Sequence, residues 1–105
     1  MSSYIFVLST VPDEKKGQEI ARALVEARLA ACVTVSADGQ SYYWWEGKIS
    51  EDKEYMLFMK TKEALYKKLE ARLKELHPYT VPEIIALPIV KGSEKYLRWL
   101  EEETE

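Results

Sequence analysis

The sequence contains one cysteine and one histidine, Cys32 and His77, the side chains that most often bind transition metals. A closed zinc site needs four ligands and usually shows paired Cys or His at short spacing, which this sequence lacks. A thiolate and an imidazole also suit copper, for which Met56 is a third soft candidate. The simpler interpretations are that Cys32 is a small buried residue and that His77 stabilises a helix end.

Three charged residues are further candidates for binding. Glu54 and Lys60 share parity on one predicted strand, but six residues at about 3.3 Å each place them roughly 20 Å apart. Each therefore needs another partner or faces solvent. Glu83 begins a predicted strand, where an acidic side chain either binds a ligand or remains solvated. Trp44 and Trp45 are adjacent, so they point to opposite faces, and one of them reaches an interface or a cleft.

Hydrophobic periodicity predicts the elements that position these residues. The order is β-α-β-β-α-β followed by a helix, which is typical of a ferredoxin-like α+β fold with both crossover helices on one face of an antiparallel sheet. Because Pro88 cannot donate a backbone hydrogen bond, the last strand is expected at a sheet edge. The strands are predicted at 4–8, 31–35 continued by 42–45, 54–60 and 84–90, and the helices at 13–29, at 61–77 and from Ser93 onward.

Local signals set the boundaries between these elements. Thr10, with a proline and an acidic residue soon after it, predicts the start of the first helix, and Thr61 is predicted to cap the second. Residues 36–40 form a turn or bulge cluster and residues 46–48 form a turn. The acidic run 101–105 is expected to be a solvated tail.

The predicted strands are too apolar for a sheet with one face in solvent. Residues 5–8, 55–59 and 84–87 are apolar at both parities, whereas a half-exposed sheet alternates apolar and polar residues. If Val33 and Val35 face the helices, Cys32 and Thr34 lie on the second face. Because 105 residues cannot supply another layer, we expect a homo-oligomer that covers this face.

Length and composition restrict the class of protein. A chain of 105 residues is the size of a single domain, 1–105. The formal charge of −3 argues against a nucleic-acid partner. The sequence has no apolar run long enough to span a membrane, and 1–4 lacks the basic region of a signal peptide, so a cytoplasmic location is expected. Lone Cys32 cannot form an internal disulfide and fits a reducing compartment.

The composition also suggests thermal stability. The sequence contains no Asn and two Gln, against 15 Glu and 11 Lys. A shortage of labile amides with an excess of ion-pairing residues is typical of thermophile proteins.

Several segments together resemble the CutA divalent-cation tolerance family. The resemblance extends from about Thr10 to Leu100. The segments are AACV at 30–33, YWWEGKI at 43–49, KT at 60–61, HPYTVPEI at 77–84, and Tyr96, Leu97 and Trp99. The resemblance implies a ferredoxin-like homotrimer similar to the PII signalling proteins, with clefts between subunits and a role in tolerance to copper and other divalent ions.

The resemblance also marks the residues of a site. As metal ligands it points to Cys32, Glu54, His77 and Glu83, for copper or another divalent cation. As residues of the cleft between subunits it points to Trp45, Lys60 and Tyr79.

The residues and the resemblance favour two functions, and neither of them is enzymatic. The first is a trimeric cytoplasmic metal-binding protein in which Cys32 is the soft ligand and His77 or carboxylates complete the site. The second is a PII-like signalling or assembly trimer that binds a small anionic ligand through Lys60 and His77, stacked on Trp45 or Tyr79. Acylphosphatases share the strand order, but their chemistry needs an Asn, and the sequence contains none. An RNA-recognition module is disfavoured because residues 53–59 do not match its aromatic pattern.

Overall fold

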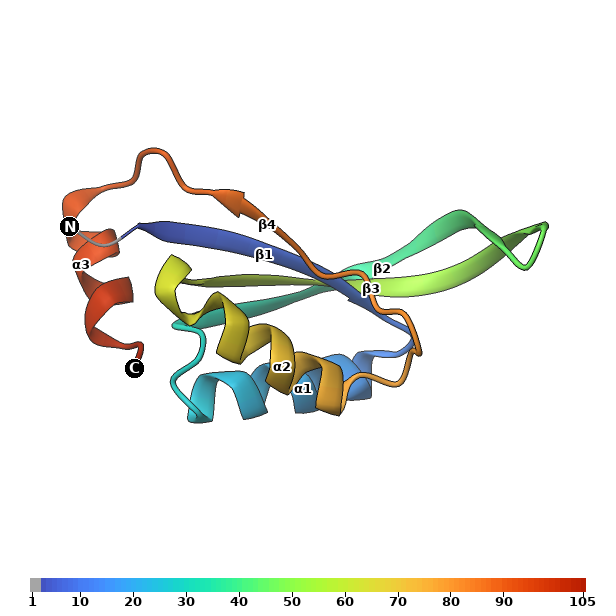
Figure 1. The fold of residues 1–105 in the computed structure, drawn as a ribbon, viewed down its shortest axis with the longest axis horizontal. Coiled ribbons are helices and arrows are strands. Elements are labelled where there is room, and N and C mark those ends of the chain that lie inside the picture. The colour runs from blue at the N-terminus through green and yellow to red at the C-terminus, as the bar shows by residue number, and fades with distance from the viewer. Residues whose placement is uncertain (1–2) are drawn as a thin grey trace.

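The computed structural model describes residues 3–105 and contains one four-stranded antiparallel sheet with two helices against one face (Figure 1). The strand order across the sheet is β2-β3-β1-β4, so the predicted α+β fold and the edge position of the last strand are confirmed. Met1 and Ser2, which entered the signal-peptide argument, lie outside the described residues. The elements are β1 Tyr4–Val11, α1 Glu14–Glu26, β2 Cys32–Trp45, β3 Lys48–Lys62, the 3-10 helix η1 Glu63–Leu65, α2 Tyr66–Leu76, β4 Ile85–Pro88 and α3 Glu94–Glu102.

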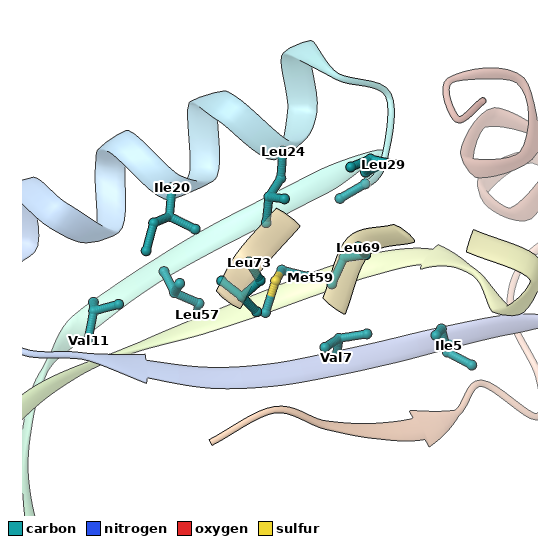
Figure 2. Packing of buried hydrophobic residues seen from close by; sticks show 11 residues of the cluster. Ile5, Val7, Val11, Ile20, Leu24, Leu29, Leu57, Met59, Leu69 and Leu73 are labelled. Atoms are coloured by element: carbon teal, nitrogen blue, oxygen red, sulfur yellow. The ribbon is translucent and has the colours of Figure 1, made fainter. Parts of the chain in front are cut away.

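The core lies between the sheet and helices α1 and α2 (Figure 2). Alternate residues of β1 and β3 point into it and meet the apolar stripe of each helix, as the strand period of two and the helix period of 3.6 require. Gly17 permits close helix-sheet packing, because a Cβ at this position would lie 3.2 Å from methyl groups of Val11 and Val35. The principal core side chains are Ile5, Val7, Val11, Ile20, Leu24, Leu57, Met59, Leu69 and Leu73.

Both predicted cap residues were wrong, although the first helix, predicted at 13–29, begins within one residue of α1. Thr10 lies in β1, opposite Met56, and α1 is instead capped by Asp13, whose side chain accepts a hydrogen bond from the Lys16 N–H. Thr61 lies in β3, and its buried hydroxyl donates to the Leu29 carbonyl at 2.7 Å. The cap signals were overridden because β1 and β3 pair with each other beyond the expected strand ends.

Strands β2 and β3 form a long hairpin that extends past the helices (Figure 1). Its register shifts between Val35 and Asp38, so the predicted irregularity at 36–40 is a β-bulge inside one continuous strand. Its tip is a two-residue turn at Glu46 and Gly47, with φ of 49° and 78°, which matches the prediction of a turn there. We call the part of this hairpin beyond the bulge, residues 38–55, the arm.

The acidic C-terminal residues were expected to form a solvated tail, but ion pairs attach them to the rest of the protein while their side chains stay partly exposed. Ion pairs join Glu103 to Arg28 at 2.7 Å and Glu105 to Lys68 at 2.7 Å. Thr104 is buried between these two glutamates. The acidic run itself does not reveal basic partners that lie 37 to 75 residues away in sequence.

Among residues 3–105, no helix combines the length and apolar character needed to cross a bilayer.

Candidate functional site

The face of the sheet that lies away from α1 and α2 in Figure 1 carries apolar side chains of β1, β3 and β4. Phe6 and Leu8 alternate with the core residues of β1, and the Phe6 and Phe58 ring centroids are 5.6 Å apart. In register with these strands, Ile85 and Leu87 of β4 are 48% and 50% exposed. We call this surface, made by Phe6, Leu8, Phe58, Ile85 and Leu87, the open face. Its composition matches the expectation of strands that are apolar at both parities.

A cavity of about 590 Å³ lies where β1 ends, the arm begins and the α2–β4 loop passes over the sheet. Four residues singled out from the sequence line it: Trp45, Glu54, Tyr79 and Glu83. We call this cavity the carboxylate pocket, because both charged side chains that line it are glutamates. The remaining lining residues are Thr10, Ser41, Tyr42, Tyr43, Pro78, Thr80 and Val81.

The bulge in β2 determines which aromatic residues share a face with Glu54. Before the bulge Thr34 pairs with Phe58, so even-numbered residues of β2 lie on the open-face side. After it Ser41 pairs with Asp52, so odd-numbered residues take that side. Tyr43 and Trp45 therefore lie on the same side of the arm as Glu54.

Glu54 is buried and is held by the hydroxyl of Tyr79. Its side chain on β3 is only 7% exposed, and the Tyr79 hydroxyl donates a hydrogen bond of 2.7 Å to its Oε2. Burial, together with this hydrogen bond, raises the pKa of Tyr79, so the phenol remains a neutral donor. A second pair lies nearby, where the Tyr43 hydroxyl donates to the Asp52 carboxylate, and that hydrogen bond is the main reason why the pKa of Tyr43 is raised.

His77 ends α2 and is buried beneath the α2–β4 loop. Its Nδ1 accepts a hydrogen bond from the Tyr79 N–H at 3.1 Å, so Nε2 carries the proton and donates to the Thr10 carbonyl at 2.7 Å. Burial lowers the pKa of His77, against the opposing effects of the Thr10 hydrogen bond and the Glu54 charge. Lys16 of α1 lowers this pKa further. The imidazole is therefore neutral at pH 7.

Cys32 and Lys60 lie outside the carboxylate pocket. They face each other in register across β2 and β3, and the Cys32 thiol is 4.0 Å from the Thr34 hydroxyl, on the side predicted for it. The Lys60 ammonium lies 5.6 Å from the centroid of the Tyr96 ring. The structure thus brings together four of the seven predicted site residues and places His77 beside them. Lys60 lies six residues after Glu54 on β3, and Cys32 lies opposite Lys60 on β2.

The fold and the motifs agree with a known family, whose sequence model, described as "CutA1 divalent ion tolerance protein", matches residues 5–103. The chain belongs to this family. It is 53% identical over 98 residues to the divalent-cation tolerance protein CutA of Thermus thermophilus, and the matched segment covers 93% of this chain and 95% of that relative. It is 45% identical over 100 residues to the CutA of Pyrococcus horikoshii, with 95% and 97% covered. The family description names ion tolerance and no enzymatic activity.

Solved CutA1 structures share the whole architecture. The Thermus thermophilus protein superposes with a TM-score of 0.95 at 51% identity, covering 97% of this chain and 99% of that one. The Oryza sativa protein gives a TM-score of 0.97 at 43% identity, covering 99% and 95%. The resemblance drawn from the motifs at 30–33, 43–49 and 77–84 is therefore confirmed at the level of family and fold.

The carboxylate pocket of this CutA1-family chain holds two of the side chains that commonly bind metal ions, Glu54 and Glu83. Within residues 3–105, no three or more His, Cys, Asp or Glu side chains are grouped so that they could hold one. Glu54 and Glu83 supply carboxylate oxygens to the pocket, which are ligands suited to hard divalent cations.

Two lining residues escaped the sequence reasoning for identifiable reasons. Thr10 was assigned to a helix start, although it continues β1 to the edge of the pocket. Tyr43 was quoted only as part of a motif, although its spacing of two from Trp45 indicates a shared face on a strand. That spacing was the signal available in the sequence.

Proposed function

We propose that this CutA1-family chain forms a homotrimer and binds a divalent cation at the carboxylate pocket, in a cleft that a second copy completes. The observation that carries the proposal is the position of the pocket, which gathers Glu54 and Glu83 on the side of the sheet opposite α1 and α2, next to the open face. The role is binding rather than catalysis.

The open face supports the assembly. Contiguous apolar surface of this kind is uncommon on monomers and marks an interface. Residues 1–105 act as one domain in each subunit, and a cyclic arrangement of identical copies buries the same face of every copy. The number of three follows from the resemblance to the CutA and PII families rather than from the surface itself.

The nature of the ligands favours cations over anions. Both charged lining residues of the pocket are glutamates, which repel an anionic ligand and attract a cation. Lys60, the basic residue of the alternative PII-like hypothesis, lies elsewhere on the sheet. A small anion would therefore have to recruit Lys60 from a neighbouring copy.

Copper binding through Cys32 is a separate proposal within the same trimer. Cys32 is a free, half-buried thiol on the open-face side, so thiols or imidazoles of neighbouring copies would have to complete a soft site. His77 was predicted to share in metal binding, and its ligation would require Nδ1 to release the Tyr79 N–H. Cu(I) titration of Cys32→Ala against the unmodified chain tests the thiol.

Calorimetric titration of the metal-free protein with Mn²⁺ and Zn²⁺ tests the carboxylate site. Glu54→Gln and Glu83→Gln are expected to weaken binding, because each removes a negative ligand. Glu70→Gln is the matched control, since Glu70 also accepts a tyrosine hydroxyl, at 3.1 Å from Tyr66, but lies on α2. Unchanged affinity in both pocket variants would exclude the site, and binding of anionic metabolites instead would favour the alternative function.

A cytoplasmic location is also proposed, supported by the free thiol of Cys32. Compartment varies among relatives, since the Oryza sativa and Arabidopsis thaliana proteins are named chloroplastic and an Archaeoglobus fulgidus structure is titled periplasmic. Cell fractionation with an antibody to the chain tests the location.

A further inference from the structure

We infer that His77 is a positioning residue: it holds Tyr79, which in turn orients the Glu54 carboxylate toward the bound cation. The inference rests on the proposed cation site and defines a different role for His77 from that of a ligand. It follows from a continuous chain of hydrogen bonds that runs from β1 through the α2–β4 loop to β3.

The first link is the state of the imidazole. Both of its ring nitrogens are already used, Nε2 as donor to the Thr10 carbonyl and Nδ1 as acceptor from the Tyr79 N–H. A metal ligand needs a free nitrogen lone pair, and the Nδ1 lone pair of the neutral ring is committed to Tyr79. Rotation of His77 toward a cation would leave the Thr10 carbonyl and the Tyr79 N–H without these partners.

The second link is Tyr79, which is fixed at its backbone and at its tip. Its N–H bonds to His77, its ring lies 4.9 Å from the imidazole, and its hydroxyl bonds to Glu54. The loop around it has no helix or strand between Leu76 and Ile85. His77 therefore supplies a fixed point on which the position of the Tyr79 side chain depends.

The third link is Glu54 itself. The Tyr79 hydroxyl occupies Oε2 at 2.7 Å and leaves Oε1 for another partner. Hydrogen bonds of this type orient metal-binding carboxylates, and removing such a partner typically lowers metal affinity about 10- to 100-fold. His77 and Tyr79 thus contribute to cation binding without contacting the cation.

The single histidine makes the state of His77 directly measurable. In protein labelled with ¹⁵N, all imidazole signals come from His77. We expect the Nε2–H tautomer in metal-free protein, and we expect its Nδ1 and Nε2 shifts to remain those of an uncoordinated ring when Zn²⁺ saturates the protein. A coordination shift at either nitrogen on Zn²⁺ binding would overturn the positioning role.

Affinity measurements with Zn²⁺ on four variants test the chain of contacts. Tyr79→Phe is expected to weaken binding about 10- to 100-fold, whereas Tyr66→Phe, which removes the comparable tyrosine bond to Glu70, leaves it unchanged. His77→Ala is expected to weaken Zn²⁺ binding. His77→Asn is expected to retain most of the unmodified chain's affinity, because the Asn side-chain oxygen can accept the hydrogen bond from the Tyr79 N–H. An amide is a poor zinc ligand, so recovery by Asn is not expected of a lost imidazole ligand.

The double variant separates the two roles of His77 most clearly. If His77 acts through Tyr79, His77→Ala adds little to the loss caused by Tyr79→Phe. Fully additive losses of affinity in variants that circular dichroism shows to be folded would overturn the inference. If His77→Ala does not fold, His77→Asn replaces it in the double variant.

The outcomes also separate this inference from the proposed function. Absence of Zn²⁺ binding by the unmodified chain, or insensitivity to both Glu54→Gln and Glu83→Gln, would overturn the cation site and this inference together. Zn²⁺ binding that needs the two glutamates but coordinates His77 would overturn only the positioning role.

Discussion

Replacing Phe58 by glutamate is expected to dissociate the assembly into single subunits. Phe58 lies at the centre of the open face, opposite Leu8 on one side and Thr34 on the other, and stacks on Phe6 at a centroid distance of 5.6 Å. It is half-buried in one copy, so the proposed neighbour covers the remainder. The substitution leaves the helix-facing core untouched.

The size of the effect follows from burial and symmetry. Burying a whole phenylalanine contributes about 1.5–3 kcal/mol, and the smaller part of Phe58 that one copy leaves exposed therefore corresponds to roughly 0.5–1 kcal/mol. Three copies together lose about 1.5–3 kcal/mol, or roughly ten- to a hundredfold in association constant. An unpaired glutamate buried at each position adds several kcal/mol per copy, so micromolar protein should be fully dissociated.

Sedimentation velocity at micromolar concentration measures the outcome. Phe58→Glu should sediment near the chain mass of 12.2 kDa, whereas the unmodified chain should sediment at three times that mass. Val25→Glu is the matched control, because Val25 is 40% exposed on α1 and away from the open face, and it should retain the assembly. A Phe58→Glu variant that keeps the mass of the unmodified chain, with native circular dichroism, would refute the reasoning.

Four further predictions concern stability. The Ser9 hydroxyl is fully buried and has no hydrogen-bond partner within residues 3–105, so Ser9→Ala should raise the free energy of unfolding by about 1 kcal/mol. Thr61→Val should lower the free energy of unfolding by about 1–2 kcal/mol, since it removes the buried hydrogen bond to the Leu29 carbonyl. Guanidinium unfolding at one protein concentration measures both variants. If both substitutions shifted the free energy of unfolding in the same direction, the roles given to the two hydroxyls would be contradicted. Because the pKa of His77 is lowered on folding, the unfolded chain binds more protons than the folded chain between that pKa and about 6.5. The free energy of unfolding should therefore fall as the pH drops through this window, and His77→Asn should make the fall less steep. Unfolding curves from pH 8 to pH 5 test this, and an unchanged slope in the variant would rule it out. Calorimetry should give a Tm above the mesophile range of about 45–65 °C, and a Tm within that range would remove the thermophile hypothesis.

Features that depend on local sequence were predicted well. The turn at Glu46 and Gly47 and the cap at Ser93 require only neighbouring residues, and both are present. The edge position of β4 followed from Pro88, because a missing N–H cannot be tolerated in a central strand.

Features that depend on distant partners were not predictable in the same way. Thr10 carries a sound helix-start signal, and only pairing with Met56 keeps it in a strand. Glu105 reads as solvated until the fold places Lys68 2.7 Å away. Which tryptophan shares a face with Glu54 depends on the extra residue that the bulge adds to β2, because without it Trp44 would take the side that Trp45 occupies.

Diffraction from crystals soaked in Zn²⁺, with data collected at the zinc absorption edge, tests the central claim most directly. The account predicts an anomalous peak in the carboxylate pocket, within ligand distance of Glu54 and Glu83, at a contact between two copies, with His77 still bonded to Thr10. A peak at Cys32 or on the His77 ring with none in the pocket would contradict it, as would a pocket that faces no second copy.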